Sequence, residues 1–175
     1  NQPFVVALGD SIIGRHAKSD IVHRMLQEFD RTKADVVVAF EEVPRTDVFR
    51  YGIAEPAGEV GDVFELKSLV EKPPVDEAPS NLAVAARYVF SPAIFDALAT
   101  QEPGKGGEIQ LTDAIQSLLS KGAKGIGMRL KEGERRFDIG NYESYFRAFL
   151  EFALTDDKHG GSLRAFVREL LDNES

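Results

Sequence analysis

Two apolar runs separated by an amphipathic segment open the chain, and their order constrains the fold more than any other feature. Residues 4–8 and 36–39 are continuous apolar runs, typical of strands buried in a parallel sheet. Between them, apolar side chains from Ile21 to Phe29 recur at helical spacing, and Ser19 is a candidate N-cap. The pattern predicts a β-α-β unit whose right-handed crossover makes the two strands parallel neighbours in one sheet.

The rest of the chain continues this α/β pattern. Residues 51–53, 63–70, 82–90 and 125–130 read as strands, and residues 92–98 and 108–119 as helices. An aromatic stripe at Tyr142, Tyr145, Phe146 and Phe149 predicts a helix that packs in a core or against another subunit. We therefore expect one domain over residues 1–175, with a strand-rich portion at 43–90 and C-terminal helices at 141–175.

Composition excludes several classes of protein. The net charge of −8 argues against a nucleic-acid surface, which needs a basic field over the phosphates. The chain has no cysteine, so it has no disulfide framework and no thiolate nucleophile. Its apolar runs are too short to span a membrane, and we expect no secretory leader before Phe4. We expect a cytoplasmic protein without nucleic-acid or membrane partners.

Two carboxylates follow predicted strands. Asp10 comes after the first apolar run, and Asp138 stands before Ile139 and Gly140. Ligands in open α/β sheets lie outside the carboxyl ends of strands, where carboxylates can hold Mg²⁺ together with substrate phosphates. The alternatives are structural: Asp10 as a turn cap, and Asp138 as the N-cap of the helix near Tyr142.

Glu71 and Lys72 stand together where a predicted strand meets two prolines. A carboxylate accepts hydrogen bonds from sugar hydroxyls, and an ammonium neutralises a phosphate. Neighbours on a strand point to opposite faces, so only a bend at the prolines lets both reach one ligand. Gly52 permits close approach of backbone to a ligand, and Asn81 can bond either a sugar or the local backbone. Each of the four also has an ordinary structural explanation.

Three motifs in a fixed order identify a family. They are Val70-Glu71-Lys72-Pro73, Pro79-Ser80-Asn81-Leu82-Ala83 and Gly107-Glu108-Ile109-Gln110-Leu111-Thr112-Asp113. With them, residues 4–154 resemble the C-terminal half of the bacterial UTP–glucose-1-phosphate uridylyltransferases (UDP-glucose pyrophosphorylases), within the sugar-nucleotidyltransferase family. The resemblance implies a Rossmann-like nucleotide-diphospho-sugar transferase fold, a mixed sheet with flanking helices.

The resemblance also assigns roles to the candidate residues. Leu8-Gly9-Asp10 matches the family's metal-binding aspartate, and Asp138 matches the partner aspartate on the same Mg²⁺. Glu71 matches the acceptor for sugar hydroxyls, Lys72 the residue on the sugar phosphate, and Gly52 the glycine whose backbone approaches the sugar. Lys72 and the two aspartates are thereby implied to be catalytic, and Asn81 joins Glu71, Lys72 and Gly52 as a substrate-binding candidate.

The implied reaction is uridylyl transfer. The phosphate of glucose 1-phosphate attacks the α-phosphorus of UTP, giving UDP-glucose and pyrophosphate. The family's glycine-rich nucleotide loop has no match here, because Gly104-Lys105-Gly106-Gly107 precedes a helix instead of following the first strand. We therefore expect a truncated or fragmentary chain with little turnover alone. Alternatives are a transferase making a dTDP-, ADP- or CDP-sugar, or a non-catalytic sugar-phosphate-binding module.

The missing strands lead to a further expectation about assembly. A sheet that lacks part of its strands exposes an edge whose backbone groups can pair with another chain. The sequence therefore predicts a homo-oligomer or a swapped dimer.

Overall fold

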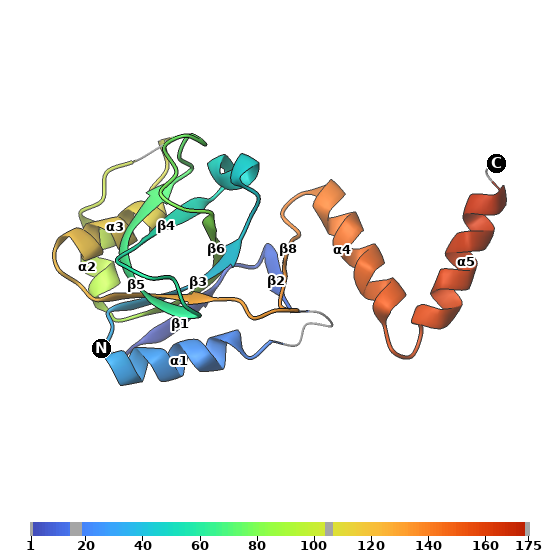
Figure 1. The fold of residues 1–175 in the computed structure, drawn as a ribbon, viewed down its shortest axis with the longest axis horizontal. Helices are drawn as coiled ribbons and strands as arrows, with labels where there is room; N and C mark the ends of the chain where they lie inside the picture. The colour runs from blue at the N-terminus through green and yellow to red at the C-terminus, as the bar shows by residue number, and fades with distance from the viewer. Residues whose placement is uncertain (1, 15–18, 104–106, 174–175) are drawn as a thin grey trace. The chain divides into compact units, whose positions relative to one another are not determined.

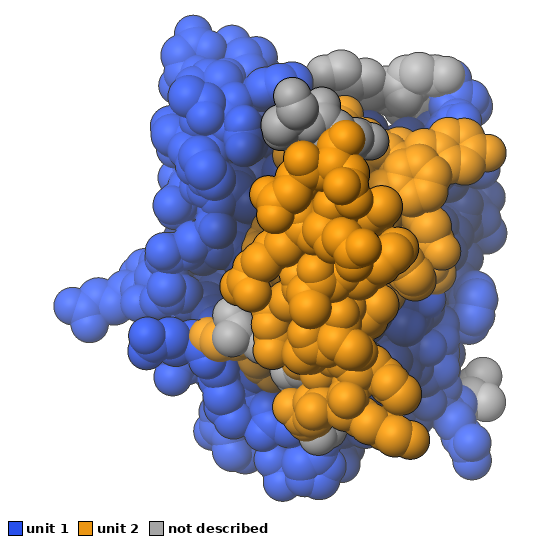
Figure 2. All heavy atoms as spheres, turned by 90° about the vertical axis from the view of Figure 1, so that its right-hand side faces the viewer, with its two compact units in different colours: residues 1–8, 20–132 blue, residues 9–19, 133–175 orange. Residues whose placement is uncertain are grey.

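The computed structural model describes residues 2–14, 19–103 and 107–173. Most of the glycine-rich stretch at Gly104-Lys105-Gly106-Gly107 thus lies outside the described residues. The chain divides into two compact units, the first made of residues 1–8 and 20–132 and the second of residues 9–19 and 133–175. Figure 2 colours the two units separately.

The first unit is built on a six-stranded mixed sheet. Its strands are β1 (Phe4–Ala7), β3 (Val36–Glu42), β4 (Gly52–Pro56), β5 (Val63–Glu71), β6 (Leu82–Phe90) and β7 (Gly125–Arg129). Their order is β1-β6-β3-β7-β5-β4, and β4 also pairs with β6. The pair β3–β7 is parallel, and the other pairs are antiparallel. The expected mixed α/β sheet is confirmed.

The prediction that the first two apolar runs are adjacent strands is wrong. β1 and β3 run in the same direction, but β6 lies between them and is antiparallel to both. β1 is also not buried: it pairs with β6 along one side, and Val5 is 40% exposed. The reason is that β6 supplies a nine-residue, largely buried strand that fits between the two shorter runs. An apolar run alone does not specify its partner.

Helices cover both faces of this sheet (Figure 1). They are α1 (Ile21–Thr32), α2 (Ala93–Ala99) and α3 (Leu111–Ser120), with a 3₁₀ helix, η2 (Arg45–Arg50), before β4. Along β3, Val36, Val38 and Phe40 join the core under α2 and α3, while the alternate residues face the side covered by α1. Both faces of β3 are buried, which explains its continuous apolar sequence.

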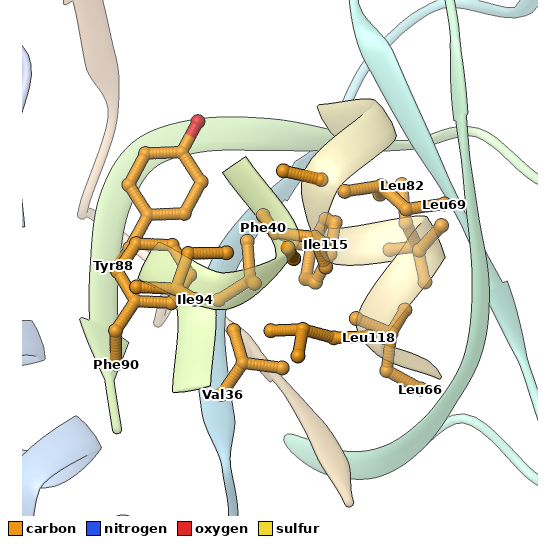
Figure 3. Packing of buried hydrophobic residues seen from close by; sticks show 14 of the residues in the cluster. Val36, Phe40, Leu66, Leu69, Leu82, Tyr88, Phe90, Ile94, Ile115 and Leu118 are labelled. Carbon is orange, nitrogen blue, oxygen red and sulfur yellow. The ribbon is translucent and has the colours of Figure 1, made fainter. Parts of the chain in front are cut away.

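The main core lies between the sheet and the pair α2–α3 (Figure 3). Ile94 from α2 and Ile115 and Leu118 from α3 pack onto Phe40 and other apolar side chains of the strands. Burial of such side chains stabilises the fold by about 1.5–3 kcal/mol each. This core fixes α3 against β5, and so positions the start of α3 beside the end of that strand.

The helix predicted over 108–119 begins three residues later, at Leu111. Gln110 is its N-cap and has an extended backbone with φ −92° and ψ 130°, so Glu108 and Ile109 precede the helix. Gly107 has φ +77°, a left-handed conformation that glycine adopts readily. The polar residues of the Gly107–Asp113 motif therefore lie partly in the loop before α3 and partly in its first turn.

The second unit contains a short hairpin-like sheet and two helices. Its elements are β2 (Ser11–Ile13), β8 (Arg136–Asp138), α4 (Tyr142–Thr155) and α5 (Gly160–Asn173). β2 and β8 are antiparallel, with Ser11 opposite Asp138. Phe137 of β8 packs against Phe152 of α4, with ring centroids 4.8 Å apart. None of the described helices is long and apolar enough to cross a membrane.

The core interpretation of the aromatic stripe on α4 is wrong. Tyr142, Phe146 and Phe149 are 83%, 61% and 62% exposed, and Tyr145 is 45% exposed. Helical periodicity identifies the stripe correctly as one face of α4, but periodicity does not say what covers that face. The described residues of the chain leave it uncovered.

Candidate functional site

Glu71 and Lys72 converge on one side of the chain because the backbone reverses its pleat between them. Glu71 ends β5, and Lys72 has φ +46°, in the left-handed region. The Lys72 Nζ then lies 3.4 Å from the Glu71 Oε1. The bend required for both to reach one ligand is thus at Lys72 itself, before the prolines.

This conformation costs free energy. A non-glycine residue in the left-handed region is disfavoured by about 1–2 kcal/mol. The Lys72 backbone N–H donates to the Tyr51 carbonyl oxygen at 2.9 Å, which holds the turn in place. Strain of this kind is found where a side chain must point in a particular direction. Here it brings a cation beside a carboxylate whose side chain is only 13% exposed.

Gly52 lies directly against the Glu71 carboxylate. The two residues are paired partners in the β4–β5 ladder. A Cβ atom on Gly52 would lie 3.1 Å from the Thr112 Oγ1, 3.2 Å from the Val84 Cγ2 and 3.3 Å from the Glu71 Oε2. Glycine therefore leaves room at the point where these three side chains meet.

Thr112 also belongs to this group, although it was not among the residues predicted to bind substrate. It lies in the first turn of α3, is 8% exposed, and presents its hydroxyl to the same point as the Glu71 carboxylate. Thr112 is part of the Gly107–Asp113 motif, and the sequence predicted for it only a position at the start of a helix. The missing signal is non-local, since it depends on how α3 docks on β5.

A side-chain hydrogen bond contributes to that docking. The Leu69 backbone N–H donates to the Gln116 Oε1 at 2.8 Å in a partly buried position. Leu69 is two residues before Glu71 on β5, and Gln116 lies one helical turn beyond Thr112 on α3. The bond therefore ties together the strand that carries Glu71 and the helix that carries Thr112.

Asn81 directly precedes β6, the strand that also carries Val84. Its carbonyl oxygen accepts from the Val43 N–H at 3.0 Å, and its side chain is half-buried. The neighbouring Ser80 hydroxyl donates to the Ala54 carbonyl of β4 at 2.6 Å. The Pro-Ser-Asn segment thus fastens β6 to β4, which is a structural role for the motif.

Asp10 and Asp138 come together in the second unit. A Cβ atom added to Gly140 would lie 3.2 Å from the Asp138 Oδ1 and 3.7 Å from the Asp10 Oδ2. The Asp138 Oδ1 accepts from the Gly140 N–H at 2.8 Å, and the Ile139 N–H donates to the Asp10 carbonyl oxygen at 2.7 Å. The two carboxylates, far apart in sequence, thus both lie beside Gly140.

The structure does not support the N-cap alternative for Asp138. The N-cap of α4 is Asn141, whose Oδ1 accepts from the Ser144 N–H at 3.0 Å. Asp138 is instead the last residue of β8, and its Oδ1 accepts from the Gly140 N–H in the turn that follows. Capping of α4 therefore does not account for Asp138.

The donor set of this carboxylate pair fits Mg²⁺. Proteins usually bind Mg²⁺ through one or two carboxylates, and waters and substrate phosphates complete the octahedron. Within the described part of the chain, no group of three or more Asp, Glu, His or Cys residues could hold a metal ion by itself. A pair of carboxylates leaves the remaining positions of an octahedral site to waters or a phosphate.

Comparison with known proteins agrees with the motifs. A UTP–glucose-1-phosphate uridylyltransferase of Staphylococcus epidermidis is 38% identical over 170 residues, which cover 97% of this chain and 57% of the relative. The Bacillus subtilis protein of the same name is 38% identical over 174 residues, covering 99% of this chain and 58% of the relative. A structure of a UTP-bound UGPase from Acinetobacter baumannii superposes with a TM-score of 0.81 at 32% identity, covering 95% of this chain and 56% of that one.

The chain is thus a partial homologue of the uridylyltransferases and spans less than three-fifths of the length of these relatives. The model of the nucleotidyl transferase family matches residues 1–154, a stretch that runs through both compact units. The strand order, the Glu71–Lys72 turn and the paired aspartates all lie within the matched stretch. On this match, the chain belongs to the nucleotidyl transferase family.

Proposed function

We propose that the chain supplies the sugar-phosphate-binding and metal-binding part of UTP–glucose-1-phosphate uridylyl transfer. In that reaction a phosphate oxygen of glucose 1-phosphate forms a bond to the α-phosphorus of UTP, and the bond to pyrophosphate breaks. The observation that carries the proposal is the Glu71–Lys72 turn, in which a strained backbone sets a cation beside a mostly buried carboxylate. A sugar phosphate offers hydroxyls to the carboxylate and an anion to the ammonium.

Glu71 and Lys72 have separate tasks in this proposal. The Glu71 carboxylate accepts hydrogen bonds from sugar hydroxyls, and Gly52 leaves the space beside it open. Lys72, whose side chain is 46% exposed, binds the phosphate and neutralises its charge. No protein nucleophile is required, because the substrate phosphate itself attacks. The chain contributes by holding the attacking oxygen in line, which is a large part of catalysis in phosphoryl transfer.

Asp10 and Asp138 would hold Mg²⁺ in the second unit. Bound there, the ion would supply positive charge to phosphate oxygens. The chain's own contribution is a rigid turn: bonds from Gly140 and Ile139 fix the Asp138 carboxylate and the Asp10 backbone. This arrangement limits the reorganisation needed when a metal and a phosphate arrive.

A second candidate is a sugar-phosphate-binding module without turnover of its own. It is supported by the Glu71–Lys72 turn, which offers a carboxylate and an ammonium to a sugar phosphate without a bound nucleotide. Both candidates require the Glu71–Lys72 site, and they differ in whether the chain forms product.

Titration of the chain with glucose 1-phosphate, with and without Mg²⁺ and UTP, tests the proposal. Calorimetry should detect binding of glucose 1-phosphate, and Mg²⁺ with UTP should strengthen it. Chromatography of the same mixtures for UDP-glucose separates the transferase from the binding module. A chain that binds dTTP, ATP or CTP in place of UTP would support one of the sibling sugar nucleotidyltransferases. A folded chain that binds no sugar phosphate would contradict both candidates.

We also propose that the chain self-associates. Among the described strands, β1 pairs only with β6, so one side of β1 offers unpaired backbone groups. The exposed aromatic side chains of Tyr142, Phe146 and Phe149 on α4 support the same proposal.

A further inference from the structure

The alternation of side chains along β5 shifts once, and this shift places Glu71 on the face that α3 covers. Leu66 and Ser68 have paired residues on β4, whereas Lys67 is an extra residue between them in the ladder. An extra residue reverses the faces that the following side chains take. Leu66 and Leu69 therefore both lie in the core beneath α2 and α3, three residues apart instead of two (Figure 3). By alternation from Leu69, Glu71 lies on the same face.

Beyond the extra residue, α3 takes the place of a strand along one edge of β5. Among the described residues, β7 pairs with β5 at residues 63–65 and no further. A buried backbone N–H needs a hydrogen-bond partner, and no neighbouring strand supplies one at Leu69. The Gln116 Oε1 on α3 accepts from the Leu69 N–H at 2.8 Å. A side chain of the helix thus completes the hydrogen bonding of the strand, two residues before Glu71.

A second contact between α3 and the end of β5 lies one helical turn away. Thr112 precedes Gln116 by four residues, so both side chains lie on one face of α3, about 6 Å apart along its axis. Leu69 and Glu71 are two residues apart, which is about 6.6–6.8 Å along a strand. The Thr112 Oγ1 and the Glu71 Oε2 would lie 3.1 Å and 3.3 Å from a Cβ atom added to Gly52. Because the two spacings nearly match, the helix and the end of the strand meet at two points in one register.

We propose that Gln116 is a positioning residue of the sugar-phosphate site, which fixes the register of α3 along β5 and so holds the Glu71 carboxylate beside Gly52. The inference rests on the proposed binding of a sugar phosphate at Glu71 and Lys72. Gln116 acts through the strand and not on the ligand. Hydrogen bonds between a hydroxyl and an oxygen acceptor need a separation of about 2.5–3.0 Å, so a small displacement of the end of β5 weakens the bonds that Glu71 makes to sugar hydroxyls.

Variants of Gln116 that are close in size separate this role from support of the fold. Gln116→Met removes the acceptor, so the Leu69 amide should exchange with solvent faster and the dissociation constant of glucose 1-phosphate should rise about three- to tenfold. Gln116→Asn withdraws the acceptor by one methylene group and should give the same two effects. Gln116→Glu keeps an oxygen acceptor, so it should retain slow exchange and an affinity within about twofold of the parent. NMR hydrogen exchange and calorimetry measure the two quantities, and circular dichroism checks the fold.

A matched control removes a bond of the same kind elsewhere. The Asp35 Oδ2 accepts from the Lys124 N–H at 2.9 Å, in the segment that follows α3. Asp35→Ala thus also deprives a backbone N–H of a side-chain acceptor, and it should leave the affinity for glucose 1-phosphate unchanged.

A double-mutant cycle identifies the route by which Gln116 acts. In a Glu71→Gln background, Gln116→Met should weaken glucose 1-phosphate binding by less than about twofold, because the carboxylate that it positions is gone. An equal loss of affinity in both backgrounds would overturn the inference, and so would a folded Gln116→Met variant with fast exchange at Leu69 and parent-like affinity. A parent chain that binds no glucose 1-phosphate would contradict the proposed function itself, and with it this inference.

Discussion

A methyl group added at Gly52 tests the geometry of the sugar-phosphate site directly. In Gly52→Ala the new Cβ would lie 3.1–3.3 Å from Thr112, Val84 and Glu71, closer than the ordinary contact of 3.4–4 Å. The side chains must move apart by a few tenths of an ångström. Because two of the three contacts are with the ends of polar side chains, we expect displacement of the Glu71 carboxylate with only modest loss of stability, about 1 kcal/mol.

That displacement should weaken sugar binding much more than folding. A hydrogen bond to a charged group contributes about 1.5–3 kcal/mol, and 1.4 kcal/mol corresponds to a tenfold change in affinity. Loss of one bond from Glu71 to a sugar hydroxyl should therefore raise the dissociation constant of glucose 1-phosphate about tenfold or more. Calorimetry measures the affinity, and urea unfolding of the same sample measures the stability.

Two other glycines provide matched controls. Nothing lies within 4 Å of a Cβ at Gly58, so Gly58→Ala should change neither quantity. At Gly127 on β7 a Cβ would overlap the buried Phe64 ring, so Gly127→Ala should lose about 1–3 kcal/mol of stability through overpacking of the core. Parent-like affinity in folded Gly52→Ala would refute the argument that Gly52 keeps space open beside the Glu71 carboxylate.

Three further predictions concern strain, pH and metal. The free energy of unfolding, measured with urea, should be about 0.5–1 kcal/mol higher for Lys72→Gly than for Lys72→Ala, because glycine adopts the left-handed backbone without strain. Equal free energies of unfolding would argue against strain at Lys72. The Lys67 ammonium, 2.5 Å from the Glu55 Oε1, holds the pKa of Glu55 below its ordinary 4.5. The stabilisation that the Lys67–Glu55 pair gives is present above pH 4.5 and is lost as pH falls through the lowered pKa. In Glu55→Gln the melting temperature should therefore fall less steeply as pH is lowered from about 6; an unchanged pH dependence would show that this pair does not contribute to it. Millimolar Mg²⁺ should raise the melting temperature of the parent chain, and Asp10→Asn or Asp138→Asn should abolish that rise; a rise retained in both variants would place the ion elsewhere.

Local periodicity predicted most elements of the fold but not their order in the sheet. The helix at Ile21–Thr32 and the strand at Leu82–Phe90 were identifiable, because their patterns run through many residues. The position of β1 was not, since it depends on pairing with β6, about 80 residues along the chain. The short 3₁₀ helix at Arg45–Arg50 also lacks a strong sequence signal.

The candidate site divides in the same way. Glu71, Lys72 and the two aspartates were selected by their chemistry, and the structure brings each pair together. Two features could not be read from the sequence. The left-handed backbone of Lys72 is unfavourable for a lysine, so propensity argues against it. The contact of Thr112 with the Gly52–Glu71 pair depends on the docking of α3, which only the folded core determines.

The most direct test of the central claim is the affinity of glucose 1-phosphate for Lys72→Ala and Glu71→Gln, measured by calorimetry on folded protein. Lys72→Ala should weaken binding by about 1.5–3 kcal/mol, through loss of the charged partner of the phosphate. Glu71→Gln keeps the shape but makes one acceptor a donor, so it should reduce discrimination between glucose 1-phosphate and other hexose phosphates more than it reduces phosphate affinity. Parent-like affinity in the first variant together with parent-like selectivity in the second would contradict the assignment of the Glu71–Lys72 turn as the sugar-phosphate site.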